Sequence, residues 1–154
     1  MVRTLILGLG NSLLSDDAIG LAAVRKLSGL FNGAALDFKS SEKVGLNLIE
    51  LLEGYDRAII IDSIITGEHP PGEIIELAMD HLPENPRLRS PHDADFKSAV
   101  ELAQKVGLKM PSSITIIGIE VSDNLKFTAS LSRQLASQMP SITRALFQKI
   151  KNLL

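Results

Sequence analysis

Two adjacent aspartates follow a glycine turn near the start of the chain, where many α/β folds bind a phosphate. The segment reads LILGLGNSLLSDDAIG over residues 5–20, and Asp16 and Asp17 stand near its end. Adjacent carboxylates would repel a pyrophosphate, so they favour a cation instead. The structural alternative is that Ser15 or Asp16 caps a helix starting near Asp17, because acidic residues stabilise a first helical turn.

A third aspartate, Asp62, interrupts the apolar run of residues 58–65. An unpaired buried carboxylate is costly, so this one must be hydrogen-bonded, exposed at a strand end, or in contact with a cation. Bonding to the backbone amides of a local turn is the structural alternative for Asp62.

His92 precedes a predicted helix start capped by Asp93. A helix N-terminus disfavours the imidazolium form, and a neutral imidazole suits a metal ligand. A lone loop histidine is also commonly a surface residue, and we predict that His69 and His81 are solvated. Asp17, Asp62 and His92 together would give two oxygens and one imidazole nitrogen, a set that suits zinc or nickel with positions left open.

A dinucleotide site is the rival interpretation of the first turn. Gly8 and Gly10 begin a G-x-G-x-x-G pattern, but Leu13 stands where the third glycine belongs. No acid ends the second predicted strand at the usual offset, since Asp37 lies later and in mid-strand. Ser90 and His92 are near each other, yet no nucleophile-elbow motif accompanies them.

Short apolar runs must supply the strands that position these residues. Runs without period-2 alternation are typical of parallel strands covered on both faces. A segment after Pro70 and Pro71 reads as an edge or hairpin strand. The predicted strands are 4–10, 35–40, 57–64, 72–77 and 113–120, with 35–40 weaker than the rest.

Helical patterns lie between the predicted strands. Their order with the strands, β-α-β-α-β-β-α-β-α-α, favours an α/β sandwich with a mostly parallel sheet. Pro140 would either start the last helix or kink a longer one. In such sheets ligands bind beyond the carboxyl ends of the strands, which selects the loops holding the candidate residues. The predicted helices are 17–28, 45–53, 94–106, 128–138 and 141–153.

Composition indicates one ordinary globular domain over residues 1–154. The formal net charge is −2, which gives no reason to expect a nucleic acid or an anionic membrane as partner. Cysteine is absent, so disulfides, thiolate zinc sites and cysteine nucleophiles are excluded. No stretch approaches the roughly 20 apolar residues of a membrane helix, and no targeting segment is recognised. The expected location is the cytoplasm.

The segment GLGNSLLSDDAIG resembles the N-terminal signature of the hydrogenase maturation proteases, G-x-G-N-x-L-x-x-D-[DE]-x-x-G. The resemblance continues at IIIDSI, PPGEI, SPH and ITIIGIE, so it extends over nearly the whole chain. It implies a twisted five-stranded sheet between two helical layers. It also implies an aspartic-type endopeptidase that trims the C-terminal tail of the large subunit of nickel–iron hydrogenases.

The resemblance places the family's metal-binding trio on Asp17, Asp62 and His92. It implies that the metal is nickel already inserted in the precursor, while the isolated protein could hold another divalent ion. Asp16 would position the loop or assist as a base. The alternative function is a metal-dependent, chaperone-like protein that binds the precursor without cutting it.

The segment after the second predicted strand departs from the family pattern. The family commonly has D-G-G-T-x-G, whereas residues 40–45 read SSEKVG, and only Gly45 matches. The acid and the flexible double glycine are replaced by a Glu-Lys pair in a stiffer segment. We expect this loop to border the site, so the difference bears on substrate identity rather than on the fold.

Overall fold

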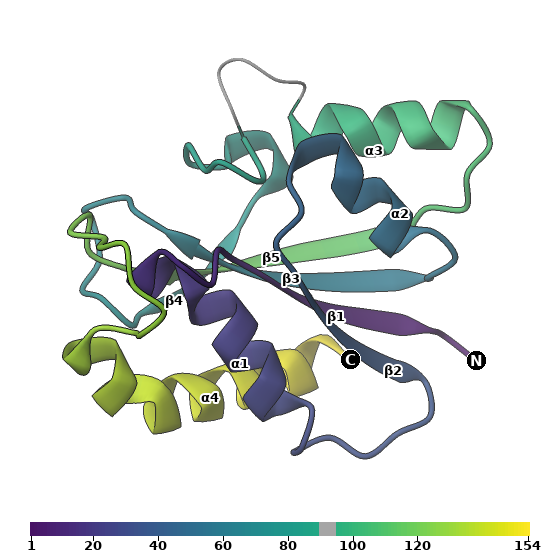
Figure 1. Ribbon diagram of the computed structural model, residues 1–154. Coiled ribbons are helices and arrows are strands. Elements are labelled where there is room, and N and C mark those ends of the chain that lie inside the picture. The colour runs from purple at the N-terminus through teal and green to yellow at the C-terminus, as the bar shows by residue number, and fades with distance from the viewer. Residues whose placement is uncertain (90–94) are drawn as a thin grey trace.

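The computed structural model describes residues 1–89 and 95–154, which form a five-stranded sheet covered on both faces by helices (Figure 1). The strand order is β2-β1-β3-β5-β4. All neighbouring strands run parallel except β4, which pairs antiparallel with β5. The strands are β1 (Thr4–Leu9), β2 (Leu36–Ser41), β3 (Arg57–Ile64), β4 (Ile74–Leu77) and β5 (Ser113–Glu120).

The helices form one layer on each side of the sheet, which confirms the expected three-layer α/β/α sandwich. Helices α1 and α4 cover one face, and α2 and α3 cover the other (Figure 1). Among the described residues, no helix is long and apolar enough to cross a bilayer. The helices are α1 (Ile19–Leu27), α2 (Ile49–Leu52), α3 (Phe96–Lys105) and α4 (Arg133–Leu153), with 3₁₀ turns η1 (Ser15–Ala18), η2 (Gly45–Leu48) and η3 (Met79–His81).

The central strands are mostly apolar because both of their faces are buried. Every residue of β1 is buried. Leu5 and Leu7 face the core beneath α2 and α3, while Ile6 faces the core beneath α1 and α4. The continuous apolar runs in the sequence therefore correspond to parallel strands between two helical layers, as predicted.

Two glycines of the first motif bring α1 against the sheet backbone. A Cβ on Gly20 would overlap the carbonyl oxygen of Leu9 and come within 2.6 Å of the Ile61 carbonyl oxygen. A Cβ on Gly8 would overlap the carbonyl oxygen of Gly20 and come within 2.6 Å of Val24. These glycines thus permit close helix–strand packing, which fixes the 3₁₀ turn η1 over the carboxyl end of β1.

Two expectations about the elements need correction. The C-terminal region holds one helix, α4, with Pro140 inside it, so the alternative of one longer helix through Pro140 holds and the two helices at 128–138 and 141–153 do not. Strand β4 is an edge strand, as expected, but it pairs with β5 and forms no hairpin with β3.

Candidate functional site

Asp17 and Asp62 come together at the carboxyl ends of β1 and β3. Asp17 lies in η1, the next element after β1, and Asp62 lies within β3. Both are buried, and Asp62 is 0% exposed. Ser63 contacts both: its hydroxyl donates to Asp17 Oδ1 at 2.6 Å, and its backbone N–H donates to Asp62 Oδ1 at 2.8 Å. The carboxyl-end rule therefore placed this pair correctly.

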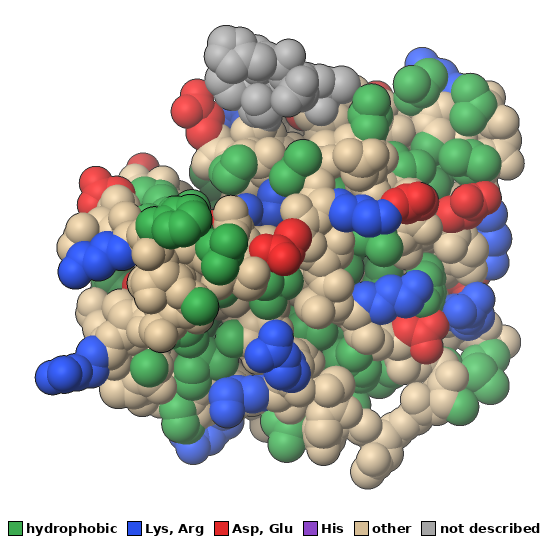
Figure 2. Space-filling model, viewed as in Figure 1, with side chains coloured by type: hydrophobic (Ala, Val, Ile, Leu, Met, Phe, Trp, Pro, Cys, Tyr) green, Lys and Arg blue, Asp and Glu red, His purple; other side chains and the backbone are tan. Residues whose placement is uncertain are grey.

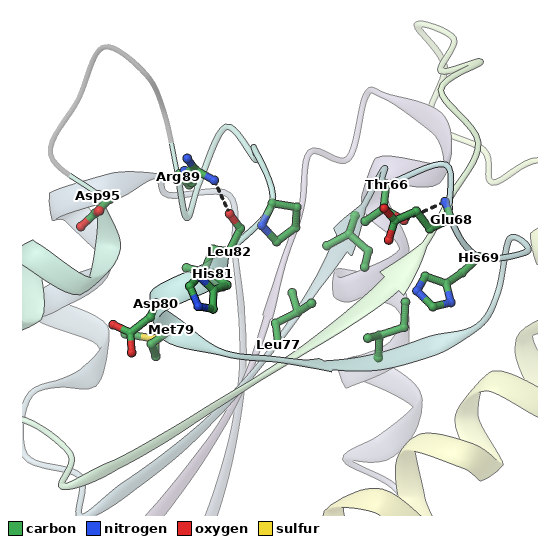
Figure 3. Close-up of a pocket in the computed structure, with 13 residues that line it drawn as sticks. Thr66, Glu68, His69, Leu77, Met79, Asp80, His81, Leu82, Arg89 and Asp95 are labelled. Atoms are coloured by element: carbon green, nitrogen blue, oxygen red, sulfur yellow. Dashed lines mark hydrogen bonds between the residues drawn. The ribbon is translucent and has the colours of Figure 1, made fainter.

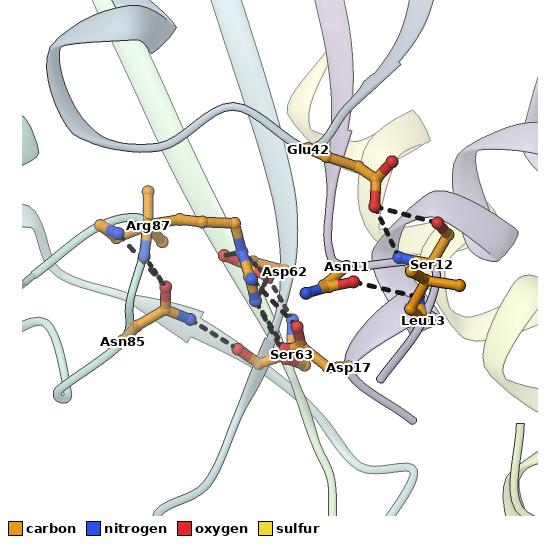
Figure 4. A network of polar contacts seen from close by, with 10 residues as sticks. Asn11, Ser12, Leu13, Asp17, Glu42, Asp62, Ser63, Asn85 and Arg87 are labelled. Carbon is orange, nitrogen blue, oxygen red and sulfur yellow. Dashed lines mark hydrogen bonds and ion pairs between the residues drawn. The ribbon is translucent and has the colours of Figure 1, made fainter. Parts of the chain in front are cut away.

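The guanidinium of Arg87 lies between the two carboxylates (Figure 4). Its Nη2 donates to Asp17 Oδ1 at 2.6 Å and to Asp62 Oδ1 at 2.8 Å. Its Nη1 donates to Asp17 Oδ2 at 3.0 Å, and its Nε donates to both carboxylate oxygens of Asp62 at 3.0 and 3.1 Å. The Arg87 side chain is only 4% exposed, so the three groups form a buried ionic cluster.

The charges of this cluster do not balance when both carboxylates are ionised. One guanidinium then offsets only one of two negative charges. Burial raises the pKa of Asp62, although hydrogen bonds and charge from Arg87 oppose this change. Burial by itself would lower the pKa of Arg87, but the bonds and charges of Asp62 and Asp17 raise it above its ordinary value. With both carboxylates ionised, the cluster therefore lacks one positive charge.

Arg87 was missed by the sequence reasoning, which named no counter-charge for the two aspartates. The loop backbone is held by other groups. The Asn85 side chain accepts from the backbone N–H groups of Arg87 and Leu88 at 2.8 and 3.2 Å and donates to the Ser63 carbonyl at 2.9 Å. The N–H of Gly45 donates to the Arg87 carbonyl at 3.1 Å. The signal available in the sequence was the need of two buried acids for a counter-charge.

The carboxylate oxygens of Asp17 and Asp62 are chemically suitable ligands for a divalent cation. Asp17 and Asp62 each aim one oxygen at the same cationic nitrogen, Nη2 of Arg87. Within residues 1–89 and 95–154, no three His, Cys, Asp or Glu side chains converge on a metal-sized space. The remaining predicted ligand, His92, lies outside the described residues, as does the predicted cap Asp93.

Asp16 points to another element and does not contact the ionic cluster. Its Oδ1 accepts from the backbone N–H of Ser132 at 2.6 Å, and Ser132 is the N-cap of α4. The expectation that Ser15 or Asp16 caps the first helix is wrong, since neither η1 nor α1 has a side-chain cap. Asp16 instead ties η1 to the start of α4, which is the loop-positioning role considered for it.

The segment that departs from the family pattern borders the site, as expected. Its Glu42 accepts from the backbone N–H of Ser12 at 2.7 Å and from the Ser12 hydroxyl at 3.0 Å (Figure 4). These bonds hold the pKa of Glu42 below its ordinary value. Glu42 thus ties the loop after β2 to the loop after β1.

Two cavities open near the ionic cluster. A small one of about 100 Å³ is lined by Asp17, Ser63, Asn85 and Ile64, among others. A larger one of about 690 Å³ shares Ile64 and extends along β4 to His81, Arg89 and Asp95 (Figure 3). Arg89 and Asp95 are the described residues on either side of the segment that contains His92. His69 and His81 line this cavity; His81 is exposed, as predicted, whereas His69 is half-buried.

Exposed apolar side chains occur in the segments that follow three of the parallel strands. They lie after β1, β2 and β5, the same edge that carries the cluster, and Phe127 is 84% exposed. Apolar and charged side chains are interspersed on the face that Figure 2 shows. We call these four residues the apolar rim: Leu13, Val44, Leu46 and Phe127.

Comparison with known proteins gives consistent results. A model of the hydrogenase maturation protease family matches residues 43–149. The hydrogenase expression/formation protein HupD of Rhodobacter capsulatus is 28% identical over 143 residues, covering 89% of this chain and 66% of that protein. The hydrogenase 2 maturation protease of Escherichia coli is 23% identical over 150 residues, covering 94% and 91%. The structure of the hydrogenase maturating endopeptidase HybD from E. coli superposes with a TM-score of 0.73 at 21% identity, covering 98% and 93%.

Proposed function

The chain belongs to the hydrogenase maturation protease family, and from this premise we propose that it removes the C-terminal extension of a nickel–iron hydrogenase large subunit after metal insertion. The observation that carries the proposal is the convergence of Asp17 and Asp62 on one cationic nitrogen at the carboxyl edge of the sheet. Two buried carboxylates that share a cation are suited to binding a metal ion that the precursor presents.

In this proposal nickel is part of the substrate. It supplies a Lewis acid that polarises the scissile carbonyl and lowers the pKa of a bound water. Asp17 and Asp62 bind the presented ion through their oxygens, and His92 adds an imidazole ligand. Ser63 orients both carboxylates through its hydroxyl and its N–H. Asp16 keeps η1 in place through Ser132, so its proposed contribution is to position Asp17.

The protein substrate has two surfaces on which to dock. The apolar rim lies in segments that follow strands at the edge carrying the cluster, and exposed apolar groups are typical of protein interaction sites. The 690 Å³ cavity offers both apolar and charged groups for an extended segment of the precursor. A net charge of −2 favours no nucleic acid partner. A cytoplasmic location is part of the proposal, and fractionation of cells that express the untagged chain tests it.

The test is to incubate the purified chain with a nickel-loaded large-subunit precursor and to detect tail release by mass spectrometry. We expect release from the loaded precursor and none from the metal-free precursor. Asp62→Ala should abolish release, whereas the matched control Asp123→Ala changes an exposed aspartate and should cleave normally. Stable binding without release would support the non-cleaving binding protein instead. Release by Asp62→Ala at the wild-type rate would refute the role of the carboxylate pair.

A further inference from the structure

The guanidinium of Arg87 fills the position that a shared metal ion would need. Oxygen ligands hold zinc at about 2.0–2.2 Å. Nη2 already lies 2.6 Å from Asp17 Oδ1 and 2.8 Å from Asp62 Oδ1, so a metal on the same two oxygens would overlap it. Occupation by Arg87 and occupation by a metal therefore exclude each other.

The side chain of Arg87 can leave this position without dismantling its loop. Asn85 holds the loop through side-chain bonds to two backbone N–H groups, and Gly45 holds the Arg87 carbonyl. Leu88, the next residue, is fully buried in the core beneath α2 and α3. None of these contacts involves the guanidinium, so the backbone stays anchored when the guanidinium moves.

A divalent ion has an electrostatic advantage over Arg87. The guanidinium brings one positive charge to two carboxylates, whereas a divalent ion brings two. Against this, the guanidinium makes five hydrogen bonds to the two carboxylates, and a metal must replace all of them. Hydrogen bonds to charged groups are among the stronger ones in proteins, so the displacement lowers the affinity for a free ion.

We propose that Arg87 occupies the cation position in the free chain and so favours binding of metal presented by a protein over binding of free metal. In the free chain it holds Asp17 and Asp62 together and competes with free divalent ions. When the precursor docks, its other contacts with the chain offset the cost of displacing Arg87. Arg87 is then a specificity-determining residue that makes the site respond to a loaded precursor and not to free metal. This inference rests on the proposed function, because it assumes that the two aspartates bind the presented ion.

The experiment measures Ni²⁺ affinity of the purified full chain by competition with a chromophoric chelator. Arg87→Gln keeps hydrogen-bonding capacity without the charge, and it should bind Ni²⁺ roughly 10- to 100-fold more tightly than the wild type. Arg87→Lys keeps the charge without the planar fork and should show a smaller gain. Arg89→Gln is the matched control, since Arg89 donates to the Leu82 carbonyl and not to the aspartates.

Thermal unfolding with and without Ni²⁺ provides a second readout. A tighter site raises the melting temperature more at the same Ni²⁺ concentration, so Arg87→Gln should gain more than the wild type. Adding Asp62→Asn to Arg87→Gln should remove the gain. If Arg87→Gln does not fold, Arg87→Lys is measured instead, and its smaller gain in Ni²⁺ affinity over the wild type tests the proposal.

Equal Ni²⁺ affinity in the wild type and in both Arg87 variants would overturn the proposal, and so would an equal gain in Arg89→Gln. The precursor assay separates this failure from failure of the proposed function. Cleavage of the precursor by a chain whose Arg87 variants show no gain would refute only the role of Arg87. A gain in affinity without any cleavage would refute only the endopeptidase.

Discussion

Replacing Gly20 by alanine should both destabilise the protein and displace its site. The new Cβ would overlap the Leu9 carbonyl oxygen and lie 2.6 Å from the Ile61 carbonyl oxygen. Ordinary van der Waals contacts lie near ~3.5 Å, so α1 must move away from the sheet by roughly 1 Å. Both obstructing atoms are backbone atoms of central strands, which cannot rotate away as a side chain would.

The magnitude follows from two opposing contributions. Overpacking of a well-packed core costs about 1–3 kcal/mol, and alanine gains about 1 kcal/mol over glycine in a helix. Because the obstruction is backbone on both strands, we expect the upper part of this range and a net loss of about 2 kcal/mol. For a chain of this length that loss lowers the melting temperature by about 4–8 °C.

Urea and thermal denaturation of Gly20→Ala and Gly29→Ala measure the effect. Gly29 is the matched control, because its Cβ would meet nothing closer than the Lys26 carbonyl oxygen at 3.8 Å. Gly29→Ala should be neutral or stabilise by up to about 1 kcal/mol. Misplacing Asp17 by about 1 Å should also reduce precursor cleavage by about 100-fold. Equal stability of Gly20→Ala and the wild type would refute the close-packing argument.

Three further outcomes are expected. Asp16→Ala should lower the free energy of unfolding by about 1–3 kcal/mol, because the Ser132 N–H loses its acceptor. Asp16→Asn keeps an acceptor oxygen and should retain most of the stability and the cleavage. Loss of cleavage in a stable Asp16→Asn would indicate that Asp16 acts as a base. Asp95→Ala should cost about 1 kcal/mol at pH 7 in urea denaturation, because Asp95 caps α3. Hydrogen bonds from Ser98 hold the pKa of Asp95 below its ordinary value of 3.8. Its contribution to stability is therefore complete above pH 3.8 and disappears as the pH falls through the lowered pKa. Asp95→Asn should lack this acid dependence, which denaturation from pH 2 to 6 measures. Tyr55→Phe should raise the pKa of Asp37 in an NMR titration, because the Tyr55 hydroxyl is the largest cause of its lowered pKa, and an unchanged pKa would contradict that bond.

The central strands were predictable from the sequence because their chemistry is local. Strands β3 and β5 have the bounds expected from the apolar runs at 57–64 and 113–120. Burial on both faces leaves a continuous apolar segment, and this pattern requires no knowledge of neighbours. The partner of β4 was not predictable in this way, since a short segment after two prolines carries no information about which edge it joins.

The C-terminal helix shows where tertiary packing outweighs a local signal. An interior proline costs about 3 kcal/mol, which favours a break at Pro140. Leu135, Met139, Ile142 and Leu146 nevertheless form one buried stripe against the sheet on both sides of the proline. Burial of several such side chains, at roughly 1.5–3 kcal/mol each, exceeds the cost of one proline. The helix therefore continues through Pro140.

Only those site residues whose positions depend on the strands were predictable from the sequence. Asp17 and Asp62 follow or end parallel strands, so the topology brought them to one edge. The cation between them comes from a loop that contains both Arg87 and Arg89. Nothing in the spacing distinguishes the two, because the direction of each side chain depends on how Asn85 turns the loop.

The ionic cluster also bears on how long a native molecule persists once formed. Arg87 is 70 residues from Asp17 and 25 from Asp62 in sequence, so the cluster joins parts of the chain that meet only after the sheet has formed. Contacts of such long range are slow to form, and we expect φ-values near zero for all three residues. Substitutions here should then accelerate unfolding and leave the folding rate unchanged. The three charges of the ionic cluster would then govern the lifetime of the folded chain and not its assembly.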